Sequence, residues 1–325
     1  MTANSSPSLL PSVEPVAGAT LPTPSLASEE SASSLSSRPS SVTETRLRVT
    51  RPKVKRHQLA LWIGAALVAA TLAVALISLL WTPADPLIAN AANRLQSPSS
   101  AHLLGTDRLG RDVLSQLMAG ARITLLVGLV AVGLAALFGI PLGLLAALRG
   151  GWLGQTLGRC FDLLLAFPGL LLAIILAAAF GGGTTTAAIA LGIGGIPAFA
   201  RVARAGALQV LSSDYVAAAR LANRPSWQIA IRHVLPNILG SLIVQASVAF
   251  GLAILAEAGL SYLGLGTAPP TPSWGRMLQD SQAFLGTHLY LVLAPGLAIA
   301  LAVLGFNLLG DGLRDRFDPH NRERL

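Results

Sequence analysis

Six apolar segments of roughly helical length alternate with polar segments along the 325-residue chain. An α-helix needs about 20 apolar residues to cross a bilayer, whereas a transmembrane β-strand needs about 10 with alternating polarity. The segments are long and lack that alternation, so they predict an all-α, polytopic membrane protein with six transmembrane helices. These predicted spans, numbered 1 to 6, cover approximately residues 59–81, 123–148, 163–180, 187–205, 238–260 and 289–309.

The polar segments predict how the spans are joined. Residues 113–118 repeat apolar side chains at helical spacing, so we expect an amphipathic helix on the outer surface before span 2. Residues 149–162 are short, basic and rich in glycine, which favours a turn, and residues 181–186 predict a second turn. Residues 261–288 predict an outer loop, and residues 311–325 predict a polar tail.

Glycine and proline interrupt two of the spans. In span 2, Gly139 and Gly143 flank Pro141, a spacing of small residues that favours ordinary close packing between helices. Span 4 contains several glycines, among them Gly195, followed by Pro197. Such a span can be a discontinuous helix that lines a transport pathway, or merely a span of poor continuity, and the sequence leaves both interpretations open.

The N-terminal residues 1–56 predict a disordered tail with a basic end. Residues 1–45 are rich in Ser, Pro, Thr and Ala and contain no aromatic residue. Six Lys and Arg side chains then lie between residues 46 and 56, directly before span 1. Residues 57–122 follow as span 1 with its outer segment, and residues 123–310 as the main transmembrane domain.

The distribution of positive charge predicts the orientation. With six spans, 18 of the 23 Lys and Arg residues fall on the side that holds both termini, and 5 fall on the other side. Basic residues are retained on the cytoplasmic side of membrane proteins, so we expect both termini in the cytoplasm. The net charge of +8 then reflects membrane orientation, and we expect no nucleic-acid partner.

Composition supports a membrane protein and does not favour an enzyme. Hydrophobic residues make up 53% and charged residues 12% of the chain, and the mean hydropathy is +0.63; soluble domains carry about 25% charged residues. The single Cys160 excludes an internal disulfide and a multi-cysteine metal site. The five histidines are scattered, no nucleophile–base pair is recognisable, and the chain lacks a GxxxxGK[ST] phosphate loop.

One polar and basic stretch, residues 211–237, separates spans 4 and 5 and reads LSSDYVAAARLANRPSWQIAIRHVLPN. Ser212, Ser213 and Asp214 can begin a helix by capping and by favouring its dipole. Asn223 tolerates the left-handed conformation that ends a helix, and Ser226 can cap a second helix over residues 227–234. The stretch therefore predicts a helix, a tight break and a second helix.

Two capped helices with aromatic side chains near water exceed what a simple connection requires. We therefore predict that residues 211–237 dock on a cytoplasmic partner, although an ordinary loop between spans is the alternative. The apolar side chains available for docking are Tyr215, Ala218, Ala219, Trp227 and Ile231, with Arg220, Arg224 and Arg232 around them.

This stretch resembles the EAA loop of binding-protein-dependent ABC importer permeases. The family pattern is Glu-Ala-Ala, three residues, Gly, and a second helix that ends in Leu-Pro; Ala218, Ala219, Leu235 and Pro236 match it. The stretch also resembles the peptide-transporting branch of the family at five positions, Tyr215, Arg220, Arg232, His233 and Asn237. Two positions differ, because Ala217 replaces the Glu and Asn223 replaces the Gly. We expect the turn to be retained and the charge contact to be lost or moved, with Asp214 a partial substitute nearly one turn away.

Four further segments resemble the second, or C-type, permease subunit of the dipeptide/oligopeptide/nickel branch. Their sequences are HLLGTDRLGRDVLSQLMAGARITL, AEAGLSYLGLG, PSWGRML and GFNLLGDGLRDRFDP. Together they extend the resemblance from residue 59 to the C-terminus. The resemblance implies the MetI-like fold of type I ABC importers and the bacterial inner membrane.

The resemblance also implies partners and a cargo. The permease would pair with a second homologous permease subunit to form one pathway, dock on two ABC ATPase subunits that bind ATP and Mg, and receive solute from an extracytoplasmic solute-binding protein. The implied cargo is a di- or oligopeptide, with nickel or another chelated metal as the alternative. The implied ATPase-coupling residues are Asp214, Tyr215, Ala217, Ala218, Ala219, Arg220, Asn223, Trp227, Arg232, Leu235 and Pro236.

Glu257 is the one acidic residue within an apolar run. An intramembrane carboxylate indicates function, so we consider Glu257, Gly195 and Pro197 as pathway or gate residues; a hydrogen bond and a solute contact both remain open for Glu257. Two other classes compete. An ion-coupled secondary transporter would require more intramembrane ionisable residues and inverted repeats, whereas the altered Ala217 and Asn223 keep an uncoupled membrane scaffold open.

Overall fold

The computed structural model describes residues 53–317, with side chains from residue 58 onward. The predicted disordered tail lies almost entirely outside the described residues. Within them the structure is helical, with a single β-bridge between Thr106 and Asp112, so the all-α prediction is confirmed. The helices are α1 (Lys53–Leu80), α2 (Val113–Arg149), α3 (Gly151–Ala166), α4 (Gly169–Phe180), α5 (Thr184–Leu211), α6 (Asp214–Leu221), α7 (Ser226–Ile229), α8 (Leu235–Tyr262), α9 (Trp274–Ser281) and α10 (Tyr290–Phe317).

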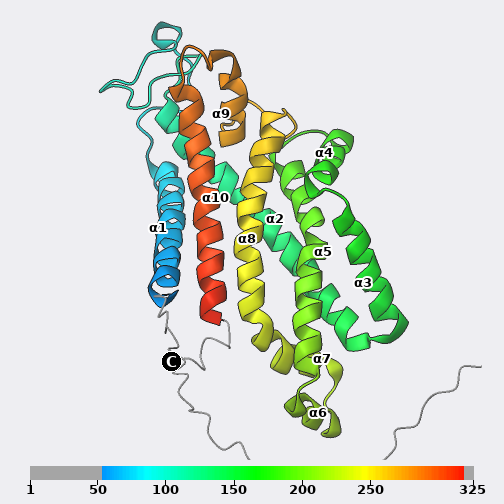
Figure 1. The fold of residues 1–325 in the computed structure, drawn as a ribbon. Helices are drawn as coiled ribbons and strands as arrows, with labels where there is room; N and C mark the ends of the chain where they lie inside the picture. The colour runs from blue at the N-terminus through cyan, green and yellow to red at the C-terminus, as the bar shows by residue number, and fades with distance from the viewer. Residues whose placement is uncertain (1–52, 318–325) are drawn as a thin grey trace, which may run out of the picture. The chain divides into compact units, whose positions relative to one another are not determined.

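Five helices are long and apolar enough to cross a membrane, and the bent pair α3–α4 provides a sixth candidate span. Figure 1 shows α1, α8 and α10 side by side, with α2 crossing obliquely behind them and α5 beside α8. The start of α1 and the end of α10 lie at the same end of the bundle as α6, while α9 and residues 82–112 lie at the opposite end. We call these the α6 end and the α9 end.

One close backbone contact joins α2 to α5 through glycines. A Cβ atom built on Gly139 would lie 2.7 Å from the Cβ of Phe199, and one on Gly143 would lie 2.9 Å from the Cβ of Ala203. Lipid tails are as apolar as leucine, so helices in a bilayer associate through close van der Waals packing, which small residues permit. The prediction of ordinary helix packing for Gly139 and Gly143 is confirmed.

A second close contact joins α1 to the antiparallel α10. A Cβ on Gly64 would lie 2.9 Å from the Cβ of Leu308, and a Cβ on Gly305 would lie 2.8 Å from the Cβ of Leu67. These positions pair the beginning of α1 with the later part of α10, so α1 is attached along its length to the helix that closes the described chain.

The α9 end is closed by a folded cap made of residues 82–112 and α9. Trp274, 3% exposed, inserts its ring against Gly120 of α2 and donates its Nε1–H to the carbonyl of Leu117 at 2.9 Å. Asp280 of α9 accepts from Arg108 at 3.0 Å, which connects α9 to the preceding cap segment. The expected loop over residues 261–288 is therefore largely ordered around a helix.

The amphipathic surface helix expected before span 2 is the beginning of α2. Asp112 caps this helix by accepting from the backbone N–H of Ser115 at 2.8 Å. Val113 and Met118, which suggested a membrane-surface helix, are both buried, and Val113 packs in one cluster with Trp274 and Met277 of α9. Their apolar spacing was correctly interpreted as helical, but the helix runs without a break into span 2.

The predicted turn at residues 149–162 and the predicted single span 163–180 are both wrong. The turn is confined to Gly150 and Gly151, which have φ of 54° and 52°, and α3 occupies the rest of the segment. α3 ends before Pro168, and α4 leaves at an angle of 81°. Because Pro168 lacks an N–H and disfavours a helical conformation at Phe167, the chain turns there.

Span 4, in contrast, is a continuous helix, so the interpretation of span 4 as a discontinuous helix is wrong. α5 runs as one helix through Gly195 and Pro197, a tolerated arrangement in membrane helices. At the other terminus, α10 extends to Phe317, so the expected polar tail is helical in its first residues.

The α2–α5 contact gives a testable expectation about stability. Gly143→Val should lower the free energy of unfolding by about 1–3 kcal/mol, the usual cost of overpacking a well-packed contact. Gly133→Val, also in α2, is the matched control because a Cβ on Gly133 meets no atom within 4 Å. Thermal unfolding of the purified chain in detergent checks this, and equal losses in both variants would contradict the packing role.

Candidate functional site

The first half of the 211–237 loop is α6 and a tight turn. Asn223 has a φ of 57°, which places it in the left-handed region, as the sequence predicted. Its N–H donates to the carbonyl of Arg220 at 3.0 Å, and the N–H of Arg224 donates to the carbonyl of Ala219 at 3.2 Å. These two bonds form a Schellman motif, which satisfies the last carbonyls of α6 and fixes the direction in which the chain leaves the helix.

The expected serine caps are not formed. Ser212 donates its Oγ–H to the carbonyl of Gln209 at 2.8 Å, and Ser213 donates to the carbonyl of Val210 at 2.6 Å. Both hydroxyls therefore bind the end of α5 instead of the start of α6. Asp214, in the first turn of α6, remains favourably placed for the helix dipole.

The second half of the loop is continuous with span 5. α7 follows Pro225, which occupies the position expected for Ser226, and residues 230–234 form a π-helix that leads directly into α8. Pro236 explains this local widening, because a proline ring clashes with the carbonyl four residues earlier and supplies no N–H. The separate second helix predicted for residues 227–234 is thus the beginning of a single rod, Ser226–Tyr262.

Buried apolar side chains fix the loop to the bundle. Val216 of α6, Ile229 of α7 and Val234 of the π-helix are at most 3% exposed. They pack in one cluster with Ala207 of α5 and Ile238 of α8. These anchors were not singled out from the sequence. A signal was present, because Val216 and Ile229 are apolar residues whose neighbours in the sequence are mostly polar or small.

Opposite the anchors, the loop presents apolar side chains to its surroundings. Trp227 is 61% exposed and Leu221 is 89% exposed. Leu221 was not predicted from the sequence as a docking residue, because Leu221 is the last residue of α6 and helical spacing does not indicate which side of the helix it faces. Ala219, expected outside, packs inward against the cluster. The predicted coupling residues that are exposed are Asp214, Tyr215, Ala217, Ala218, Arg220, Asn223, Trp227, Arg232 and Pro236, while Leu235 is half-buried.

Tyr215 and Asn237 connect the two halves of the loop. The Asn237 side chain donates to the Tyr215 hydroxyl at 3.3 Å and to the carbonyl of His233 at 2.6 Å. The rings of Tyr215 and His233 lie 6.2 Å apart at a tilt of 51°. These contacts couple the position of α6 to the first turn of α8.

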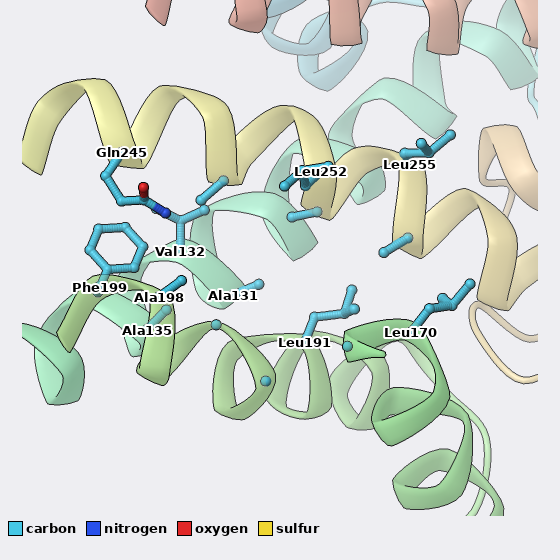
Figure 2. Close-up of a pocket in the computed structure, with 16 residues that line it drawn as sticks. Ala131, Val132, Ala135, Leu170, Leu191, Ala198, Phe199, Gln245, Leu252 and Leu255 are labelled. Atoms are coloured by element: carbon cyan, nitrogen blue, oxygen red, sulfur yellow. The ribbon is translucent and has the colours of Figure 1, made fainter. Parts of the chain in front are cut away.

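An apolar cavity of about 400 Å³ lies between α2, α4, α5 and α8. Figure 2 shows Gln245 of α8 near Phe199 of α5 at one end, and Leu170 of α4 with Leu255 of α8 toward the other. Gln245 is the one lining residue with a polar side chain among the described residues. The cavity therefore offers an uncharged wall with a single amide.

The three predicted pathway residues are placed differently. Gly195 lines the cavity, and a Cβ atom there would lie 2.8 Å from the Cβ of Ala135, another lining residue. Pro197 is buried within α5 and does not line it. Glu257 follows the lining residue Ala256 but is fully buried on another face of α8.

The carboxyl group of Glu257 is surrounded by hydroxyl groups from three segments. Ser261 Oγ donates to its Oε1 at 2.7 Å, and Thr267 Oγ1 lies 3.4 Å from the same oxygen. Thr124 of α2 donates to its Oε2 at 3.2 Å. These contacts connect α2, α8 and the segment before α9. Of the two roles considered for Glu257, they correspond to the hydrogen bond and not to the solute contact.

No group of three or more His, Cys, Asp or Glu side chains within the described part of the chain could hold a metal ion. The features that remain are a membrane bundle with an apolar intramembrane cavity and an anchored helical loop at one end. This combination is the one expected of a transport permease, a protein that forms a path through the membrane.

The chain belongs to the family of binding-protein-dependent transport system inner membrane components, whose sequence profile matches residues 139–323. It is 41% identical to the dipeptide transport system permease protein DppC of Alkalihalophilus pseudofirmus, over 82% of this chain and 88% of that protein. It is 44% identical to the glutathione transport system permease protein GsiD of Pectobacterium atrosepticum, over 69% and 74% of the two chains. The predicted class, an ABC importer permease, is confirmed.

The fold is likewise similar to a solved transporter structure. A chain of the MetNI methionine ABC transporter, in an inward-facing conformation, matches with a TM-score of 0.54 at 18% identity. The match covers 62% of this chain and 96% of that chain. The predicted MetI-like fold is confirmed.

The Asn223 turn is testable by substitution. Asn223→Val should open the turn, because a β-branched residue in the left-handed region costs roughly 1–2 kcal/mol. The peptide containing the Arg224 amide should then exchange hydrogen roughly 5- to 30-fold faster. Asn223→Gly should keep or increase protection, and Ala222→Val, at an ordinary φ of −76°, should change little. Equal exchange in all three variants would contradict the strained turn.

Proposed function

We propose that this chain forms half of the membrane pathway of an ATP-driven importer of di- or oligopeptides. A second homologous permease subunit supplies the other half, a solute-binding protein delivers the peptide, and two ABC ATPase subunits bind ATP and Mg. The observation that carries the proposal is the anchored loop with exposed apolar side chains, in a chain whose family consists of transport permeases.

The names of the relatives and the character of the cavity support a peptide cargo. Two relatives carry the names dipeptide and di/tripeptide transport system permease protein, from Alkalihalophilus pseudofirmus and Pseudomonas aeruginosa. A cavity of about 400 Å³ is within the ~300–1,000 Å³ range of small-molecule sites. Its uncharged wall favours no particular peptide charge, so selection among peptides falls to the binding protein.

Charge supports the orientation of the loop. Arg220, Arg224 and Arg232 are exposed at the α6 end, and the basic residues before span 1 precede a helix that starts at that end. Under the positive-inside rule this end is cytoplasmic, so both termini and the loop face the ATPases in the bacterial inner membrane. The apolar side chains of Tyr215, Leu221 and Trp227 then dock in an ATPase groove.

The loop transmits movement because each of its helices is attached to a span. α6 follows α5 within three residues, and α7 is continuous with α8. Both α5 and α8 line the cavity. A displacement of the loop by closing ATPases therefore tilts the two helices that shape the pathway. Within this scheme Glu257 is a positioning residue that holds α8 to α2 near the α9 end.

Reconstitution tests the proposal. Proteoliposomes with this chain, its partner permease, the ATPases and the binding protein should hydrolyse ATP faster when a dipeptide is added. Trp227→Ala should lower this stimulation severalfold, because buried tryptophans dominate docking interfaces. Trp152→Ala is the matched control, since Trp152 is 78% exposed but belongs to the start of α3, outside residues 211–237.

Two outcomes contradict the proposal. If dipeptide and binding protein never stimulate hydrolysis, the uncoupled scaffold is favoured over the importer. If stimulation is normal but Trp227→Ala and Trp152→Ala behave alike, and cross-linkers placed at Ala218 capture no ATPase subunit, the loop is not the docking element.

A further inference from the structure

A cationic pocket lies between α3 and α5, apart from both the apolar cavity and the loop. It has a volume of about 140 Å³, and its polar lining residues are Asp162 of α3 with Arg201 and Arg204 of α5. One water needs roughly 10–15 Å³ by this measure, so the pocket has room for a group of several atoms. Its walls include apolar Phe161 and Leu208.

Charge in this pocket is not balanced. Arg201 donates to Asp162 at 2.6 Å, and both side chains are more than half exposed. Arg204 forms no ion pair within residues 58–317, and its Nε is buried without a hydrogen-bond partner there. A buried donor without a partner is costly, so the guanidinium of Arg204 favours an anionic acceptor.

The structure makes space for this guanidinium. Gly158 of α3 lies directly beneath it, and a Cβ atom at that position would lie 2.9 Å from Arg204 Cζ and closer still to Nη1. Any larger residue at Gly158 would displace the group. The glycine thus holds α3 close enough to α5 to confine Arg204 between the helices.

The position along α5 corresponds to a membrane boundary. Residues 184–200 of α5 carry no charge and extend over about 26 Å at 1.5 Å per residue. The hydrocarbon core of a bilayer is about 30 Å thick. Arg201 and Arg204 directly follow this uncharged stretch, where the basic side chains of a span are expected to reach the headgroup region.

Apolar side chains continue from the pocket toward the hydrocarbon. Leu163 and Leu164, which follow Asp162 on α3, are 68% and 51% exposed. A guanidinium beside exposed leucines matches a ligand with an anionic head and an apolar tail. A guanidinium also fits phosphate oxygens with two parallel hydrogen bonds.

We propose that the α3–α5 pocket binds the phosphate of an anionic phospholipid, with Arg204 as its principal ligand and Arg201 at the rim. The site needs only that α3 and α5 lie in a membrane, so it does not depend on which solute is transported. The bound lipid would fill the wedge between α3 and α5 and stabilise the packing of α3, the helix that precedes the 81° bend.

Native mass spectrometry of the full-length chain in neutral detergent tests the site. The probes are short-chain phosphatidylglycerol, short-chain phosphatidylcholine and inorganic phosphate. The chain should retain phosphatidylglycerol in preference to phosphatidylcholine, and millimolar inorganic phosphate should not displace it. Arg204→Gln should weaken phosphatidylglycerol binding by about tenfold or more, the loss expected for charge-assisted hydrogen bonds.

Two variants separate the pocket from general surface charge. Arg159→Gln removes the same charge from an exposed position of α3 that does not line the pocket, and it should leave binding almost unchanged. Gly158→Ala keeps every charge but displaces the guanidinium, and it should weaken binding. If Arg204→Gln does not yield folded protein by size exclusion, Gly158→Ala and Arg204→Lys provide the test instead. Arg204→Lys should bind phosphatidylglycerol more weakly than the unchanged chain, because lysine lacks the planar fork of donors.

Several results would overturn the assignment. Equal retention of the two lipids removes the preference for anionic lipid, and equal losses in Arg159→Gln and Arg204→Gln indicate surface charge only. Displacement of the lipid by inorganic phosphate at matching concentration identifies a free-phosphate site. Binding that appears only when a second permease or a peptide is added assigns the arginines to that partner instead.

Discussion

The backbone contact between α2 and α5 determines where the rest of the structure lies. Gly139 and Gly143 allow α2 to approach α5 more closely than any side chain would permit, and the cavity borders this contact through Ala135 and Gly195. The loop is attached to the end of the same α5. In a bilayer no hydrophobic effect drives helices together, so contacts of this density are the principal way to fix a helix.

Hydropathy could predict the number of spans but not the bend within one of them. The apolar run over residues 163–180 passes through the break at Phe167 and Pro168 without a polar interruption, so only Pro168 signalled a bend. Likewise, the glycines at 154 and 158 looked like turn residues. In the structure they are packing positions, Gly154 against the carbonyl of Ala146 and Gly158 against Arg204. Local sequence does not distinguish these uses of glycine, because the difference lies in a neighbouring helix.

The site shows the same division between local and tertiary information. Asn223 was predictable because the left-handed turn depends on the residue itself and on bonds within five residues. The anchoring by Val216 was not predictable, because its partners belong to α5 and α8. For Glu257, Ser261 one turn away could be inferred, whereas Thr124 is 133 residues distant in the chain and is brought close only by the packing of α2 on α8.

The continuous helix Ser226–Tyr262 also determines the direction in which the exposed face of the loop points around the helix axis. It contains 37 residues, about 55 Å at 1.5 Å per residue, so roughly 25 Å of it exceeds the hydrocarbon thickness of about 30 Å. Trp227 and Ile231 lie near its start. Each added or removed residue would turn their face by about 100° relative to the bundle. The number of residues in the rod, and not only their identity, therefore specifies the azimuth at which the exposed face meets its surroundings.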